Sequence, residues 1–137
     1  MQFVETEIAG AYLLELERRS DERGYFARVW CEKELREHGL NPALNQINTA
    51  FSPRAGTLRG LHFQIAPHEE VKIVRCTRGA VFDVIVDLRP ASATFRKWAG
   101  FALSADDGQS LYVPEGCAHG YLTLTDNVDL MYLASVP

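Results

Sequence analysis

Three segments of the sequence carry polar residues whose types and spacing could do chemistry. Residues 58–64, LRGLHFQ, form a turn that leads into a strand and would present His62 on one strand face. Residues 114–120, PEGCAHG, place His119 at the start of another strand after a Pro/Gly turn. Lys72 adds a cationic donor. Because imidazole titrates near neutral pH, such a set could transfer protons or bind an anion.

The same segments resemble the two motifs of cupins, small jelly-roll barrels that often bind a metal through side chains of both motifs. The second motif, PxGxxH, is intact at residues 114–119, whereas the first is altered. Gln64 stands two residues after His62, and counting back from Gly79 puts Lys72 at the usual glutamate position. A neutral amide and an ammonium do not hold a divalent cation, so we expect a cavity without metal and no cofactor.

Composition indicates an ordinary globular chain with no nucleic-acid or membrane surface. The 137 residues are 47% hydrophobic and 23% charged, with a formal net charge of −4. This length is typical of one domain, which we expect to span residues 1–137. No run of four basic residues occurs, so an anionic ligand would have to be held by a few placed arginines.

The cysteines and the N-terminal segment predict a cytoplasmic protein. Cys31, Cys76 and Cys117 are odd in number and lack CxxC spacing, which favours neither disulfides nor a zinc site. The first residues show no basic segment followed by an apolar one, as a signal peptide would. No apolar run approaches the roughly 20 residues that span a bilayer.

The elements that must position these residues are mostly short strands. One helix is expected over residues 32–38, with Gly39 at the position where helices often end. Many short strands with Gly/Pro punctuation and little helix predict an all-β sandwich or barrel. The expected strands are residues 71–77, 81–88, 111–114, 121–125 and 130–134.

The segment 81–88, VFDVIVDL, alternates between two faces. Phe82, Val84, Val86 and Leu88 share one face, which we expect to face the core. The other face carries Asp83, Asp87, Val81 and Ile85. That second face could be a solvated outer surface, or it could line a polar cavity.

The sequence as a whole resembles the dTDP-4-dehydrorhamnose 3,5-epimerase family, which are metal-free cupins. The resemblance implies a cupin-type double-stranded β-helix, or jelly roll, with one short helix. Each matching segment is weak alone, but their number, order and spacing make the match specific. The matching segments are residues 21–26, 46–48, 58–64, 72–75, 79–89, 94–95, 114–116, 118–120 and 131–132.

The resemblance implies epimerisation of dTDP-linked 4-keto-6-deoxyhexoses at C3, C5 or both. A C4 ketone acidifies the neighbouring hydrogens, so a base can form an enolate and an acid can return a proton to the opposite face. By the resemblance, His62 is the base, Tyr132 the acid and Lys72 the group that stabilises the enolate. Read alone, a histidine after a turn is more often structural, and Tyr132 would be a core residue.

The same resemblance implies how substrate is bound and how chains assemble. Members of the family form a homodimer in which the N-terminal strand crosses to the partner, so that residues of this strand would complete the neighbouring pocket. A dTDP-sugar is the implied ligand. The implied substrate-binding residues are Arg23, Phe26, Arg28, Gln46, Asn48, Arg59 and His119.

The sequence departs from the family pattern at several positions. Family members usually continue beyond the position of Pro137 with an acid that pairs with the catalytic histidine, so we expect another partner for His62. Asp83 is the candidate, and Asp87 is expected to be more solvated. The family commonly has Glu where Arg28 stands and Gln where Glu70 stands.

Two other functions remain open. Short cupins of similar length include 3,4-ketoisomerases that act on the same substrates with similar His/Tyr chemistry. The departures from the family pattern also suit a catalytically degenerate cupin that only binds a nucleotide sugar. His38 and His68 are expected to be surface residues with no role in either function.

Overall fold

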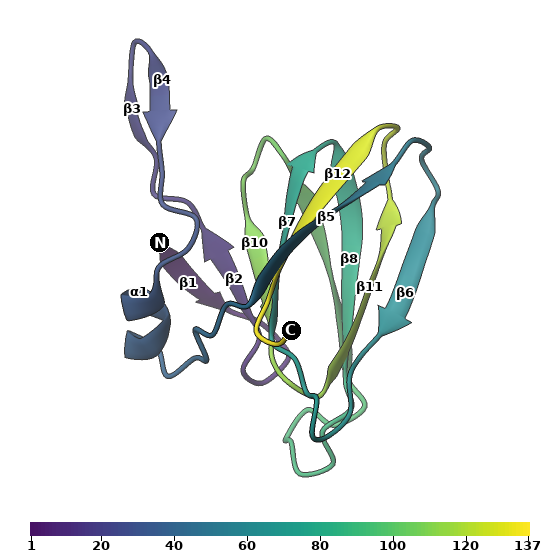
Figure 1. Ribbon diagram of the computed structural model, residues 1–137. Helices are drawn as coiled ribbons and strands as arrows, with labels where there is room; N and C mark the ends of the chain where they lie inside the picture. Colours follow the sequence, from purple (N-terminus) through teal and green to yellow (C-terminus); the bar gives the residue numbers. More distant parts are fainter.

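The computed structural model describes residues 1–137 as two antiparallel sheets that face each other, with one short helix at the side (Figure 1). The larger sheet has the strand order β1-β2-β10-β7-β12-β5, and the smaller has the order β6-β11-β8-β9. The elements are β1 (Gln2–Glu5), β2 (Tyr12–Glu15), β3 (Arg19–Asp21), β4 (Gly24–Phe26), α1 (Glu32–Glu37), β5 (Gln46–Ser52), β6 (Leu58–His62), β7 (Lys72–Arg78), β8 (Ala80–Asp87), β9 (Trp98–Ser104), β10 (Ser110–Val113), β11 (Cys117–Thr123) and β12 (Val128–Ala134).

Consecutive strands repeatedly change sheets, which brings distant parts of the sequence to one interior. β7 lies in the larger sheet and β8 in the smaller one, with the turn at Gly79 between them. Gly79 has a φ of 78°, a left-handed conformation that glycine adopts at little cost. β11 and β12 make a second such crossing. The short strands predicted a sandwich or barrel, and the result is the two-sheet jelly roll that the family resemblance implies.

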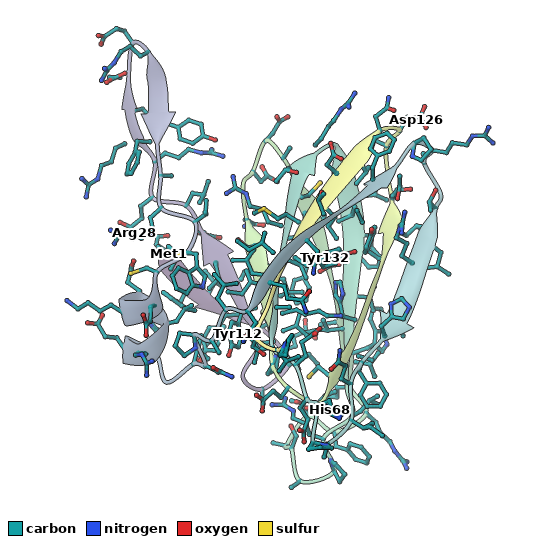
Figure 2. All side chains as sticks on the ribbon, viewed as in Figure 1. Met1, Arg28, His68, Tyr112, Asp126 and Tyr132 are labelled. Atoms are coloured by element: carbon teal, nitrogen blue, oxygen red, sulfur yellow. The ribbon has the colours of Figure 1, made fainter.

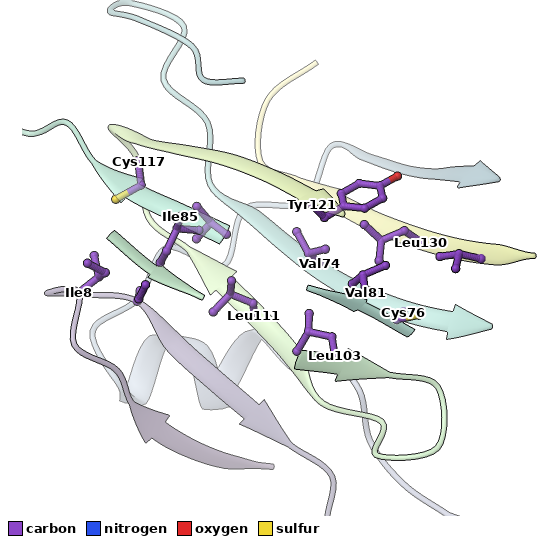
Figure 3. Close-up of a cluster of buried hydrophobic side chains, with 14 residues drawn as sticks. Ile8, Val74, Cys76, Val81, Ile85, Leu103, Leu111, Cys117, Tyr121 and Leu130 are labelled. Atoms are coloured by element: carbon purple, nitrogen blue, oxygen red, sulfur yellow. The ribbon is translucent and has the colours of Figure 1, made fainter. Parts of the chain in front are cut away.

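The main core fills the space between the two sheets (Figure 3). Of its 14 buried residues, Ile8 and Ala11 lie between β1 and β2, and the others come from strands, whose successive side chains point to opposite faces. Val74 and Leu130 come from the larger sheet. Val81 and Ile85 come from β8 of the smaller sheet, and Leu103 comes from its edge strand β9. The sheets are therefore joined by apolar packing over one part of their length.

A second cluster joins α1 to the outer face of the larger sheet. Leu35, the one buried residue of the helix, packs there with Leu14, Ile73 and Tyr112. The helix ends at Glu37, and Gly39 follows with a φ of 70°. The sequence prediction of a helix at residues 32–38 is thus confirmed to within one residue.

Strand β8 corrects one prediction. The buried side chains are Val81, Asp83, Ile85 and Asp87, whereas Phe82 is 36% exposed. The face that carries the two acids is therefore the inner face, and the expectation that Phe82, Val84, Val86 and Leu88 face the core is wrong. The physical reason is that each buried carboxylate has partners inside the protein, so the acids need not face water.

Asp87 shows how such a buried acid is satisfied. Its carboxylate accepts hydrogen bonds from Arg89 Nε at 2.9 Å, Ser92 Oγ at 2.5 Å and Thr94 Oγ1 at 2.6 Å. Burial would raise the pKa of Asp87, but the bonds from Arg89, Ser92 and Thr94 hold that pKa well below its usual range. The expectation of a solvated Asp87 is wrong, because the loop after β8 folds back over it.

The hairpin β3–β4 stands away from both sheets (Figure 1). Arg23 at its turn pairs only with Asp21, 2.7 Å away, and its side chain is 84% exposed. Phe26 at its end is 73% exposed. The six residues of α1 are the only helix, and no helix of this chain meets the length and apolarity of a membrane span.

We expect Asp87→Asn to lower the free energy of unfolding by about 2–4 kcal/mol at pH 7, because a buried charged network loses its anion. The folded-state pKa of Asp87 lies below the unfolded value. Its stabilisation is therefore present above a pH of about 4 and is lost as the pH falls below that value. Urea unfolding of both proteins between pH 2 and pH 7 measures this. Equal stability at pH 7, or a difference that grows in acid, would contradict the assignment.

Candidate active site

A cavity of about 510 Å³ opens between the sheets beside the main core. Its volume is in the range of small-molecule binding sites. Polar side chains from both sheets line it, whereas apolar side chains fill the neighbouring part of the interior. Its lining residues are Gln46, Asn48, Ala50, Arg59, His62, Gln64, Glu70, Lys72, His119, Gly120, Tyr121, Tyr132, Ala134 and Pro137.

His62 and His119 face the cavity from adjacent strands of the smaller sheet. They are direct partners in the pairing of β6 with β11. The strands can approach closely because Gly60 and Gly120 lie between them: a Cβ at Gly60 would be 2.7 Å from the His119 carbonyl oxygen. Gly60 also has a φ of 92°. The glycine of the LRGLHFQ segment therefore allows the local geometry that places His62.

Asp83 contacts His119 rather than His62, which corrects the predicted pairing. His119 Nε2 and Asp83 Oδ1 are 2.6 Å apart, and both side chains are almost fully buried. The strand order explains the contact, because β11 lies between β8 and β6. Burial raises the pKa of Asp83, and the neighbouring His119 and Lys72 act against this rise. The second oxygen of Asp83, Oδ2, has no hydrogen-bond partner.

Tyr132 reaches the cavity from the opposite wall, on β12 of the larger sheet (Figure 2). Its hydroxyl donates a hydrogen bond to the Tyr121 hydroxyl at 3.2 Å. Its ring lies edge-on to His119, with centroids 6.3 Å apart. Burial, with the Tyr121 bond in addition, raises the pKa of Tyr132 above its usual range. The phenol is therefore protonated at neutral pH and can act as a proton donor.

Lys72 lies at the start of β7 and is paired inside the cavity. Its ammonium is 3.2 Å from Glu70 Oε1, and the two side chains are only 22% and 10% exposed. Gln64 Nε2 donates to the other oxygen of Glu70 at 3.3 Å. No group of three or more His, Cys, Asp and Glu side chains in the chain is arranged to hold a metal ion.

Arg59, Gln46 and Asn48, three of the residues expected to bind substrate, line the cavity as well. The Arg59 guanidinium donates to Ser52 Oγ at 3.2 Å and to the Phe51 carbonyl at 3.0 Å. Asn48 Nδ2 donates to Gln46 Oε1 at 3.3 Å, which joins two neighbouring amides of β5. These three side chains offer a charged donor and two amides to a ligand.

Three predicted binding residues do not reach the cavity of their own chain. Arg23 and Phe26 belong to the projecting hairpin. Arg28 lies beside α1, where it pairs with Glu34 at 3.1 Å (Figure 2). None of them lines the cavity. The expected surface positions of His38 and His68 agree with the structure, where both are exposed.

Tyr121 and Glu70 are two titratable side chains of the cavity that were not among the predicted site residues. Tyr121 follows His119 by two positions on β11, so the period-two alternation of a strand places both on the inner face. Applying that rule to the smaller sheet would have found Tyr121. Glu70 precedes β7, and nothing in the sequence indicates that it turns inward to Lys72.

The fold and the cavity together define a cupin-type jelly roll with a cluster of acid–base side chains. Comparisons with known proteins agree. The profile of the family described as dTDP-4-dehydrorhamnose 3,5-epimerase matches residues 5–137. The chain therefore belongs to the dTDP-4-dehydrorhamnose 3,5-epimerase family of isomerases, and the predicted family and cupin fold are confirmed.

Individual relatives are similar over nearly the whole chain. The dTDP-4-dehydrorhamnose 3,5-epimerase of Sinorhizobium fredii is 43% identical over 137 residues, which are 100% of this chain and 70% of that protein. The crystal structure of the Bacillus anthracis enzyme with TDP and PPi bound has a TM-score of 0.94 at 41% identity and covers 99% of this chain and 78% of its own. That of the Legionella pneumophila 3,5-epimerase in complex with dTDP-4-keto-L-rhamnose has a TM-score of 0.90 at 34% identity, covering 99% and 72%.

We expect Asp83→Asn to shift the ring ¹⁵N resonances of His119 and to leave those of His62 unchanged. An amide cannot accept the short hydrogen bond from His119 Nε2–H as a carboxylate does, whereas His62 has no bond to Asp83. Histidine-selective NMR of the folded variant measures both rings, with His62→Gln used to assign the signals. A shift of His62 with His119 unchanged would show that Asp83 serves His62 in solution.

Proposed function

We propose that this protein epimerises dTDP-linked 4-keto-6-deoxyhexoses at C3, C5 or both, by proton transfer through an enolate. The observation that carries the proposal is the position of His62 and Tyr132 on opposite walls of one cavity. Epimerisation needs a base on one face of the sugar ring and an acid on the other, and the two sheets supply one each.

The chemistry of the cavity side chains supports this assignment. His62 is the proposed base, because neutral imidazole can accept a proton near neutral pH. Tyr132 is the proposed acid, and its raised pKa keeps the phenol protonated until a strong base such as an enolate carbon forms beside it. Lys72 is the proposed donor to the enolate oxygen, where a preformed cation stabilises the charge that develops.

The end of the cavity away from Lys72 suits a nucleotide diphosphate. A guanidinium is a natural partner for phosphate oxygens, and Arg59 presents one into the cavity. The amides of Gln46 and Asn48, which lie toward the Lys72 end of β5, can bind sugar oxygens. The nucleotide and the keto-sugar bound to the relatives from Bacillus anthracis and Legionella pneumophila support a dTDP-sugar as the ligand.

We expect His62→Ala and Tyr132→Phe each to reduce turnover by about 10²–10⁴-fold, the usual contribution of a general acid or base. Proton NMR of dTDP-4-keto-6-deoxyglucose with enzyme in D2O measures exchange at C3 and C5. Tyr132→Phe should retain deuterium exchange, because His62 alone abstracts the proton, while inverted product is lost.

The same NMR experiment separates the alternatives, with thermal unfolding as the control for folding. A carbonyl that moves to C3 would identify a 3,4-ketoisomerase. No exchange at all in the wild-type protein would identify a binding protein without turnover. Wild-type rates in either variant would remove that residue from the mechanism.

We further propose a homodimer in which the β3–β4 hairpin of each chain completes the cavity of the other. The exposure of Phe26 and of the Arg23 guanidinium supports this, because an exposed aromatic side chain and an exposed cation on a projecting hairpin are suited to an interface. In this arrangement Arg23 and Phe26 contact the ligand of the partner subunit, and Arg28 lies at the edge of the same interface.

Mixing Arg23→Ala chains with His62→Ala chains should restore activity to about a quarter of the wild-type level. Half of the chains form mixed dimers at random assortment, and one of the two cavities in a mixed dimer has both residues intact. Each variant alone is the control, assayed at the same total concentration. A monomer by light scattering at micromolar concentration, or no recovery after mixing, would contradict the proposal.

A further inference from the structure

Two cationic side chains line the cavity, and they lie toward opposite ends of it. In the register of the larger sheet, Lys72 of β7 lies opposite Ala134 of β12. Ala134 in turn lies opposite Gln46, at the first position of β5. Arg59 bonds to Ser52 at the last position of β5. Six residue steps of about 3.3 Å separate the ends of this strand by about 20 Å. A ligand in the cavity therefore meets one cation from each direction.

The surroundings of these two cations differ in charge. The hydrogen-bond partners of Arg59 are a hydroxyl and a backbone carbonyl, so its positive charge is not compensated. Lys72 lies 3.2 Å from the Glu70 carboxylate, and Glu70 is held in place by Gln64. Asp83 is also close enough to Lys72 for the ammonium to act on its carboxyl group. The Arg59 end of the cavity thus has a net positive charge, whereas the Lys72 end has no net positive charge.

This asymmetry matters for a ligand with a charged end and a neutral end. A diphosphate could bind to either cation if both were free. We propose that Glu70 determines the orientation of the substrate, because its carboxylate repels phosphate from Lys72 and leaves Arg59 as the diphosphate site. The proposal rests on the proposed function in one respect, that the substrate is a nucleotide-linked sugar.

The Lys72–Glu70 pair still permits the chemistry proposed for Lys72. An ammonium has three N–H donors, and the contact with Glu70 uses one of them. The remaining donors can bond to a ketone oxygen, which carries no full charge when the substrate arrives. Glu70 would therefore discriminate between a phosphate and a sugar carbonyl at Lys72, and it acts as a positioning residue rather than as a group that takes part in the reaction.

Inorganic pyrophosphate tests this proposal without turnover. We expect Glu70→Gln, which keeps the size of the side chain, to bind pyrophosphate about tenfold more tightly than the wild type or at a second site, by calorimetry at low salt. Glu69→Gln is the matched control, because it removes the same charge from the neighbouring residue, which does not line the cavity. Equal gains in both variants, or no gain in Glu70→Gln, would overturn the proposal.

Lys72→Gln and Arg59→Gln give the second line of evidence. In the wild-type background, Lys72→Gln should leave pyrophosphate affinity within about twofold, and Arg59→Gln should reduce it by about tenfold or more. The gain from Glu70→Gln should disappear in the Glu70→Gln/Lys72→Gln double variant. A loss of affinity in Lys72→Gln alone as large as the loss in Arg59→Gln would overturn the proposal, even if the Glu70 variants did not fold. Absent epimerase activity would affect none of these measurements.

Discussion

The hydrogen bond between Asp83 and His119 lies among the residues of the apolar core, and His119 also lines the adjoining cavity. Ile85 on β8 and Tyr121 on β11 belong to the core cluster, while Asp83 and His119 lie on the same inner faces. A carboxylate so deeply buried is tolerated only when it is hydrogen-bonded, and His119 supplies that bond. The pair lets polar side chains occupy an interior that the rest of the fold fills with apolar ones.

The two sheets then determine which side of the cavity each reactive group occupies. The smaller sheet supplies His62 and His119, and the larger sheet supplies Lys72 and Tyr132. Because the sheets are held apart by the common core, groups on them stay on opposite sides of any ring bound between them. The separation of His62, the proposed base, from Tyr132, the proposed acid, is therefore a property of the whole two-sheet architecture and of no single loop.

Some of this could be predicted from the sequence because it depends on local chemistry. The helix at α1 follows from local residues such as Gly39, and the cavity positions of His62 and His119 follow from the resemblance to the cupin motifs. The inner face of β8 could not be predicted in the same way. Alternation shows that Phe82 and Asp83 lie on opposite faces, but which face is buried depends on partners that are distant in sequence, such as His119.

The same dependence on distant partners explains why the predictions for Asp83 and Asp87 were wrong. Asp83 was assigned to His62 because both belong to the segments that carry the cavity residues, yet the strand order puts β11 between them. Asp87 was expected in solvent because a turn follows it, and the partners Ser92 and Thr94 lie in the loop that covers it. Pairings of this kind depend on sheet order and loop path, which a single sequence does not specify.

Three carboxylates in or near the interior share one further property. Asp83 is paired with His119, Asp87 with Arg89 and Glu70 with Lys72. Burying an acid is costly unless it is hydrogen-bonded or paired, so each of these three carboxyl groups has a basic partner inside the fold. Arg59 is the cavity cation that this pairing leaves free. A chain with a net charge of −4 can therefore present a positive site to an anionic ligand, because its interior acids are already compensated by other side chains.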